Sequence, residues 1–303
     1  MQINIRYGIA TLLKNPNVFF QELKEDIQKD FFNKSNLKKY SFIWCAALPK
    51  SGSTLIEKIL NGLDYVQLNK SFLRKFSYSG LDHPHGISIN MVKDLPLKRY
   101  TFLKTHSHYE KNYIDIVKSH NAKIIVSTRN LRDMLISNYF YIMENPRSWE
   151  HQYIKNLDIK TGLIKSLYLY DKKKVNQTPL EYYLKWMSGW KEYINKNKDI
   201  LHLKYEDLNL DRELYIKKIL NYLNIPIELC TKIQKVIDED QNNSSLLNKN
   251  LKKIGRSIST YDFLSKNKKK TLISQELKAK LNEIIIKKAN EFKVDYSIIN
   301  NEF

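Results

Sequence analysis

The chain has 303 residues, enough for one large α/β domain or two small ones. Its 51 Lys and Arg against 32 Asp and Glu give a formal charge of +19, although lysine is dense throughout the chain. Such a charge suits an anionic ligand, a nucleic acid or an acidic membrane surface. Two cysteines, Cys45 and Cys230, are too few for a disulfide framework, so a reducing, cytoplasmic location is expected. No apolar run is long enough for a transmembrane segment, and no signal peptide is recognised.

Nothing in the sequence indicates a split into separate domains. The 8 glycines and 7 prolines are scattered, and there is neither a flexible linker nor an internal repeat. Residues 1–40 contain amphipathic helical stretches and are expected to form an N-terminal helical preface. Residues 41–303 are then expected to form one domain.

The stretch from Phe42 to Gly62 predicts a buried strand, a loop of small residues and a helix. Residues 42–48 are almost wholly apolar and too few for an ordinary helix, and apolar residues recur at helical spacing from Leu55 onwards. A glycine in such a loop lets the backbone approach a charged group, and the helix N-terminus favours an anion there. The sequence therefore predicts an anion site. Its residues are Lys50, Ser51, Gly52, Ser53 and Thr54.

The position of the lysine separates this loop from the nucleotide-binding P-loop. That motif has two glycines and places its lysine directly after the second one, whereas Lys50 precedes Gly52 here. An ATPase or GTPase is therefore a poor fit. Pro-Lys-Ser-Gly-Ser-Thr at residues 49–54 instead resembles the phosphosulfate-binding loop of the PAPS-dependent sulfotransferases.

Further strands and helices alternate along the chain. Strands are expected at residues 99–104, 123–127 and 200–204. Helices are expected at 114–120, 131–144, 178–198, 212–223, 227–240 and 275–292. This alternation predicts an α/β fold with a central parallel sheet flanked by helices, in which ligands bind at the carboxyl ends of the strands. The family resemblance implies a three-layer, P-loop-like version of that fold.

The third expected strand leads into a second motif. Ser-Thr-Arg-Asn-Leu-Arg-Asp at 127–133, followed by Ser137, resembles the family's 3′-phosphate-binding signature, with Leu131 in place of the usual proline. Arg129 at the strand end can pair bidentately with a phosphate, and Ser137, two turns into the next helix, can reach the same group. A local helix pair between Arg129 and Asp133 is the alternative, but it would leave Ser137 and the first loop unexplained.

A third motif contains the candidate base. Lys-Thr-His at residues 104–106 resembles the family segment whose histidine takes a proton from the acceptor, which implies that role for His106. A neutral imidazole suits this step, and His108 is the alternative base. The histidine pairs at 83/85 and 106/108 have no cysteine or carboxylate at ligand spacing, so no metal site is expected.

Two later segments resemble cofactor contacts of the same family. Tyr-Glu-Asp-Leu at 205–208 resembles a segment whose tyrosine lies close to the nucleotide, although Asp207 can also be interpreted as a helix cap. Residues 252–256 loosely resemble the element that closes over the 3′-phosphate, which implies contacts from Gly255 and Arg256. Leu55 stands where the family often has an aromatic residue that stacks on adenine, so the adenine contact stays open.

The resemblance implies an enzyme that transfers a sulfuryl group from PAPS (3′-phosphoadenosine 5′-phosphosulfate) to a hydroxyl or amine and releases PAP. Lys50, His106 and Ser137 are its expected catalytic residues. The acceptor is left open among small molecules, lipids and carbohydrates, as is the oligomeric state, and no specific nucleic-acid partner is expected. One alternative is a basic nucleic-acid-binding protein, suggested by the charge and the 12% aromatic residues. The other is a nucleotide-dependent kinase, which the position of Lys50 disfavours.

Overall fold

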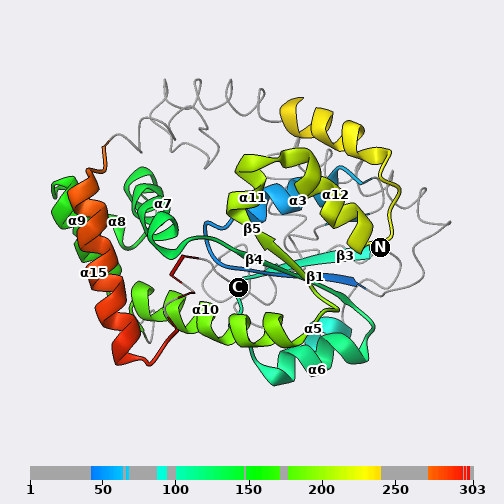
Figure 1. Cartoon of the computed structure of the whole chain (residues 1–303), viewed down its shortest axis with the longest axis horizontal. Helices are drawn as coiled ribbons and strands as arrows, with labels where there is room; N and C mark the ends of the chain where they lie inside the picture. Colours follow the sequence, from blue (N-terminus) through cyan, green and yellow to red (C-terminus); the bar gives the residue numbers. More distant parts are fainter. Residues whose placement is uncertain are drawn as a thin grey trace, which may run out of the picture. The chain divides into compact units, whose positions relative to one another are not determined.

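The computed structural model (Figure 1) describes residues 42–63, 66–67, 87–93, 100–146, 148–170, 177–239, 272–295, 297 and 299–300. Several predicted features lie outside these residues. They are the preface at 1–40 and the two contacts Gly255 and Arg256. The division of the chain at residue 40 also stays a prediction.

Five strands form one sheet in the order β2-β3-β1-β4-β5. The strands are β1 (Phe42–Ala47), β2 (Val66–Gln67), β3 (Tyr100–Thr105), β4 (Lys123–Thr128) and β5 (Leu201–Lys204). β1 and β3 pair in parallel from Phe42↔Thr101 to Ala46↔Thr105, and β2 also runs parallel to β3. Helices lie between the strands in the chain, so the predicted α/β fold with a central parallel sheet flanked by helices is confirmed.

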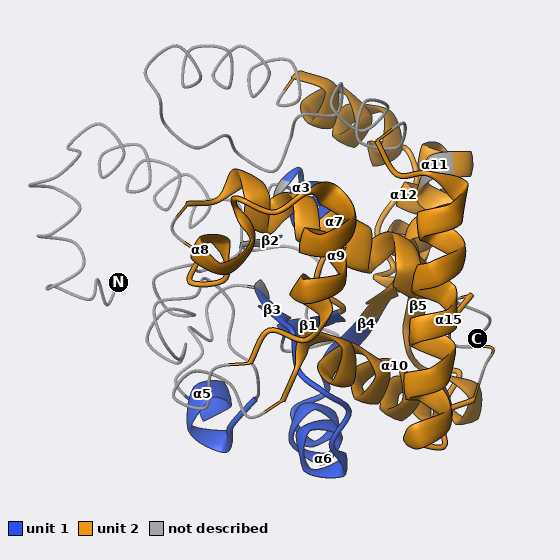
Figure 2. Cartoon of the chain, turned by 90° about the vertical axis from the view of Figure 1, so that its left-hand side faces the viewer, with its two compact units in different colours: residues 1–47, 54–125 blue, residues 48–53, 126–303 orange. Residues whose placement is uncertain are grey.

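The contacts of the chain divide it into two compact units, which Figure 2 colours separately. Unit 1 comprises Met1–Ala47 and Thr54–Ile125, and unit 2 comprises Leu48–Ser53 and Val126–Phe303. β4 contributes residues to both units. The turn after β1 belongs to unit 2, although the strand before it belongs to unit 1.

Unit 1 is built on the apolar strand β1. Every residue of Phe42–Ala47 is buried, as expected for a strand covered on both faces. Its helices are α3 (Ser53–Asn61), α5 (Ile89–Lys93) and α6 (Lys111–Ser119). α3 buries Ile56, Ile59 and Leu60, because their spacing places them on one helix face.

Unit 2 contains most of the helices in the described part of the chain. They are α7 (Leu131–Glu144), α8 (His151–Ile154), α9 (Ile159–Leu167), α10 (Pro179–Lys196), α11 (Tyr205–Leu210), α12 (Arg212–Tyr222), residues 229–239, and α15 (Gln275–Glu291). α10 begins with a capping box between Thr178 and Glu181. It buries Trp186 and Trp190 completely, so these aromatic side chains belong to the core.

Candidate active site

The turn at residues 48–53 has two residues in the left-handed region of the backbone map. Lys50 has φ 64° and Gly52 has φ 87°. Left-handed φ costs a residue other than glycine about 1 kcal/mol or more, so surrounding contacts must hold Lys50 in place. A Cβ atom at position 52 would lie 2.8 Å from Cδ2 of Tyr205, so this position requires glycine for its conformation and for the space.

Ser51 fastens this turn to the end of β4. Its hydroxyl lies 2.6 Å from the Leu48 carbonyl and 3.0 Å from the Ser127 carbonyl, and donates a shared hydrogen bond to them. The Ser127 hydroxyl donates back to the Ser51 carbonyl at 2.7 Å. Both serines are fully buried. Ser51, which the resemblance names as a cofactor contact, therefore has internal partners for its hydroxyl.

The side chain of Lys50 lies against an aromatic ring of α7. Its Nζ atom is 4.4 Å from the centroid of the Tyr141 ring, a cation–π contact. Tyr141 is four residues after Ser137, so the two share one face of the helix. Sequence reasoning did not single out Tyr141, although this spacing from Ser137 was available as a signal.

Arg129 contacts the same turn from the other motif. Its Nη1 donates to the Lys50 carbonyl at 3.0 Å, and its Cζ lies 4.3 Å from the centroid of the Tyr205 ring. Asp133 pairs instead with its neighbour Arg132, at 3.3 Å. The alternative of a local Arg129–Asp133 pair is therefore wrong. Among the described residues, Arg129 donates one hydrogen bond, so its other N–H donors can serve an anion.

Tyr205 and Glu206 join the end of β5 to the loop that carries Arg129. Oε1 of Glu206 accepts a hydrogen bond from the Asn130 backbone N–H at 2.8 Å. The Asn130 side chain in turn caps α7. Asp207 pairs with Lys218 at 3.0 Å and does not cap α11, so the predicted cap at this position is wrong.

The remaining anion-binding candidates lie on α3 and α7. α3 begins at Ser53, is nine residues long, and has no acidic residue in its first turn, so its free N–H groups can receive an anion. Ser53 is 8% exposed. Thr54 on α3 and Ser137 on α7 are partly exposed.

His106 follows β3 directly and lies in unit 1. Its Nδ1 is 2.7 Å from the carbonyl oxygen of Ala47, the last residue of β1. Because a carbonyl can only accept, Nδ1 carries the proton, and the neutral ring has its lone pair on Nε2. Next to it, the buried Thr105 hydroxyl accepts from Trp44 Nε1 at 2.9 Å and from the Ser107 hydroxyl at 2.8 Å. His108 is also partly exposed.

Residues 41–293 match the model of the sulfotransferase domain family. The chain belongs to this family. It is 23% identical to a flavonol 3-sulfotransferase of Flaveria bidentis, over 61% of this chain and 57% of the relative. It is also 23% identical to cytosolic sulfotransferase 7 of Arabidopsis thaliana, over 70% of this chain and 66% of that protein. The chain thus spans less than two thirds of the length of each relative.

Solved structures with a related fold include a retinol dehydratase in complex with retinol and PAP, and a mouse sulfotransferase in complex with PAP. The retinol dehydratase is 16% identical, and the match covers 90% of this chain and 88% of the dehydratase chain, with a TM-score of 0.49. The mouse sulfotransferase is 20% identical, and the match covers 69% of this chain and 66% of the mouse chain, with a TM-score of 0.47.

The sulfotransferase domain also holds a buried ion pair that sequence reasoning missed. The Lys104 ammonium, on β3, pairs with the Glu57 carboxylate of α3, and both side chains are buried. Both charges act on the Cys45 thiol, but burial dominates and raises its pKa to about 12. A protonated, buried thiol is unreactive, so Cys45 packs as an apolar residue.

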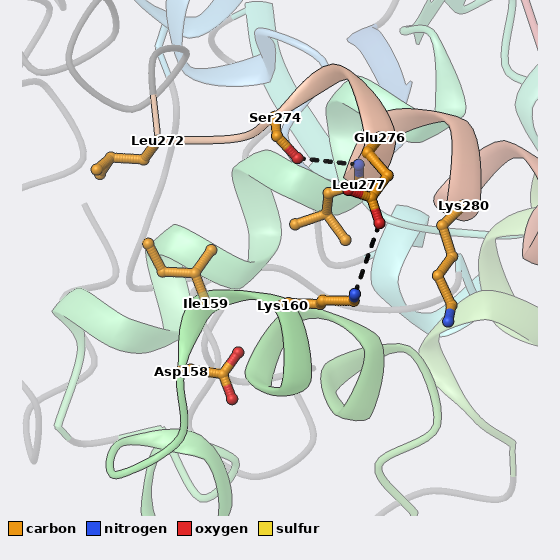
Figure 3. A pocket seen from close by; sticks show the side chains of 8 residues that line it. All are labelled: Asp158, Ile159, Lys160, Leu272, Ser274, Glu276, Leu277 and Lys280. Atoms are coloured by element: carbon orange, nitrogen blue, oxygen red, sulfur yellow. Dashed lines mark hydrogen bonds and ion pairs between the residues drawn. The ribbon is translucent and has the colours of Figure 1, made fainter.

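A hollow of about 470 Å³ between the starts of α9 and α15 holds none of the predicted site residues (Figure 3). Asp158 and Ser274 use their side chains to cap these two helices, and Lys160 pairs with Glu276 at 3.8 Å. The side chains of Asp158, Lys160, Ser274 and Glu276 are thus engaged within the protein. Across the described part of the chain, no cluster of three or more His, Cys, Asp or Glu could hold a metal ion. No described helix is long and apolar enough to cross a membrane.

Proposed function

We propose that this sulfotransferase domain transfers a sulfuryl group from PAPS to a hydroxyl or amine acceptor and releases PAP. The turn after β1 carries this proposal. Lys50 stands there before Gly52, and its carbonyl accepts a hydrogen bond from Arg129. Two cationic residues, Lys50 and Arg129, are thereby linked within unit 2. This suits a donor with an anionic group at each end.

The donors of this region would hold both ends of PAPS. The phosphosulfate would be held by the Lys50 ammonium, the Ser53 and Thr54 hydroxyls and the first N–H groups of α3. Ser51 and Gly52 would shape that loop around it. The 3′-phosphate would be held by the remaining N–H donors of Arg129 and by the Ser137 hydroxyl.

Three further residues would complete the nucleotide contacts. Tyr205 would lie close to the nucleotide, beside Arg129, whose guanidinium its ring contacts. Gly255 and Arg256 would add contacts to the 3′-phosphate.

In the proposed reaction, Nε2 of His106 takes the proton of the acceptor, whose oxygen or nitrogen attacks the sulfur. A new bond forms from the acceptor to sulfur, and the bond from sulfur to the bridging oxygen breaks. Negative charge grows on that oxygen, and the Lys50 ammonium stabilises it. In this proposal Lys50 supplies charge stabilisation, His106 accepts one proton, and Ser137 positions the donor. Charge stabilisation, proton transfer and positioning are each established sources of enzymatic rate enhancement.

The acceptor is proposed to be a small molecule, a lipid or a carbohydrate. Small hydroxyl-bearing molecules come first, because one relative of this chain is a flavonol 3-sulfotransferase. Both cysteines are buried and free, which supports a reducing compartment such as the cytoplasm.

A screen that follows labelled sulfate from PAPS into small-molecule, lipid and carbohydrate acceptors tests the proposal. We expect at least one class to be labelled, and Lys50→Ala to lower kcat at least ~100-fold, as for other key transition-state donors. Lys196→Ala is the control, because Lys196 is 70% exposed and pairs with Glu192 one turn away on the same helix. Near-normal turnover by Lys50→Ala would remove Lys50 from the mechanism.

A further inference from the structure

The backbone of Lys50 is held in an unfavourable conformation by contacts from the end of β4. Its φ of 64° lies in the left-handed region. The neighbouring Ser51 is fastened to Ser127 at the end of β4. The carbonyl of Lys50 itself is held by Arg129, two residues further along the chain from Ser127. The placement of the Lys50 backbone therefore depends on where the Arg129 guanidinium lies.

The Arg129 guanidinium is in turn placed by Tyr205. The guanidinium carbon lies 4.3 Å from the centroid of the tyrosine ring, within the range of a cation–π contact. The same ring lies so close to Gly52 that a Cβ there would meet it at 2.8 Å. Tyr205 is 8% exposed, and the adjacent Glu206 is hydrogen-bonded to the Asn130 backbone. One rigid ring thus contacts both the arginine and the turn that carries the lysine.

We propose that Tyr205 is a positioning residue, which couples occupation of the anion site at Arg129 to the conformation of Lys50. An anion bound by the N–H donors of Arg129 that no described residue occupies fixes the plane of the guanidinium. The ring of Tyr205 and the hydrogen bond to the Lys50 carbonyl then transmit that restraint to the turn. This inference rests on the proposed function, in which Arg129 binds the 3′-phosphate.

One consequence concerns the choice of donor. A nucleotide without a 3′-phosphate leaves Arg129 less restrained, so Lys50 is less well placed for the transfer step. Adenosine 5′-phosphosulfate should therefore be a poor donor through a lower kcat, and not only through a higher KM.

Hydrogen–deuterium exchange of the peptide covering residues 48–53 tests the coupling without any acceptor. The full chain is compared with saturating PAP and with saturating adenosine 5′-phosphate. In the wild-type protein, PAP should slow exchange at least about threefold more than adenosine 5′-phosphate does. In Tyr205→Leu the two nucleotides should protect the peptide equally, whereas Tyr205→Phe, which keeps the ring, should behave like the wild type.

A second variant covers the case in which Tyr205→Leu does not fold. Arg129→Lys keeps the charge but lacks the planar fork, so it cannot hold the carbonyl and a phosphate together, and it should also abolish the difference. If PAP binds but both nucleotides protect the wild-type peptide equally, the coupling is overturned. An undiminished difference between the nucleotides in Tyr205→Leu or Arg129→Lys also overturns it. A wild-type protein that does not bind PAP overturns the proposed function and the coupling with it.

Discussion

The Lys104 ammonium and the Glu57 carboxylate form an ion pair inside unit 1, where 2% and 8% of the two side chains are exposed. Removing one partner leaves an uncompensated charge out of water, so we expect Glu57→Ala to lower the free energy of unfolding by about 3–5 kcal/mol in urea denaturation. The control is Glu213→Ala, because Glu213 pairs with Lys217 at 2.5 Å on an exposed helix face. It should cost less than about 1 kcal/mol. Equal losses in the two variants would contradict a buried, interdependent pair.

Gly52→Ala should destabilise the protein through the turn after β1. The backbone at position 52 has φ 87°, and the added methyl group would stand 2.8 Å from the Tyr205 ring. A loss of about 1–3 kcal/mol is expected from the strain and the contact together. Gly162→Ala is a matched control, since its Cβ would meet the Tyr139 ring at 3.1 Å without a left-handed backbone. Thermal unfolding should show the larger loss for Gly52→Ala, and the reverse order would exclude the strain argument.

His202 should make the protein less stable in mild acid. Burial lowers the pKa of His202 from 6.5 to about 4, and the Lys204 and Lys218 ammonium groups lower it further, against the Asp207 carboxylate. The unfolded chain therefore binds the proton first. The stability contribution is complete above pH 6.5 and is lost as the pH falls towards 4, by at most about 3 kcal/mol.

The measurement for His202 is the unfolding temperature between pH 7 and pH 4. The Thr128 hydroxyl lies 2.7 Å from Nε2 of His202. His202→Gln removes the titration while leaving an amide that can bond the Thr128 hydroxyl, so its unfolding temperature should fall less across this range. Parallel curves for the two proteins would show that His202 does not carry the effect.

His106→Ala should separate proton transfer from nucleotide binding. The contact of Nδ1 with the Ala47 carbonyl places the lone pair of the ring on Nε2, as a general base requires. We expect kcat to fall about 10²–10⁴-fold, with PAP affinity unchanged by calorimetry. His108→Ala tests the alternative base: if that variant loses turnover and His106→Ala does not, the assignment moves to His108.

Local patterns in the sequence predict the elements well where start signals and spacing agree. The helix expected at residues 131–144 is α7, Leu131–Glu144, with Asn130 as its cap. The region at 145–178 has no comparable signature, and α8 and α9 lie within it. Both helices are short, and for short helices packing outweighs the propensity of the sequence.

Local sequence patterns cannot predict the contacts between the motifs. Arg129 and the Lys50 carbonyl are 79 positions apart in the chain. Tyr205 and Gly52, which lie in contact, are separated by still more positions in the chain. Such pairs depend on the order of the strands in the sheet, whereas hydrophobic periodicity reports only which face of an element is buried. The sequence therefore predicts candidate residues for the site, and the structure adds how Lys50, Arg129 and Tyr205 are joined.

Thermal stabilisation of the chain by nucleotides tests the central claim most directly. If this domain binds PAPS and PAP, a saturating excess of PAP should raise the unfolding temperature, since a ligand at 100 times its Kd adds about 2.7 kcal/mol of stability. ATP and a DNA oligonucleotide at the same concentration should have little effect. Stabilisation by ATP or by the oligonucleotide, with none by PAP, would contradict the account.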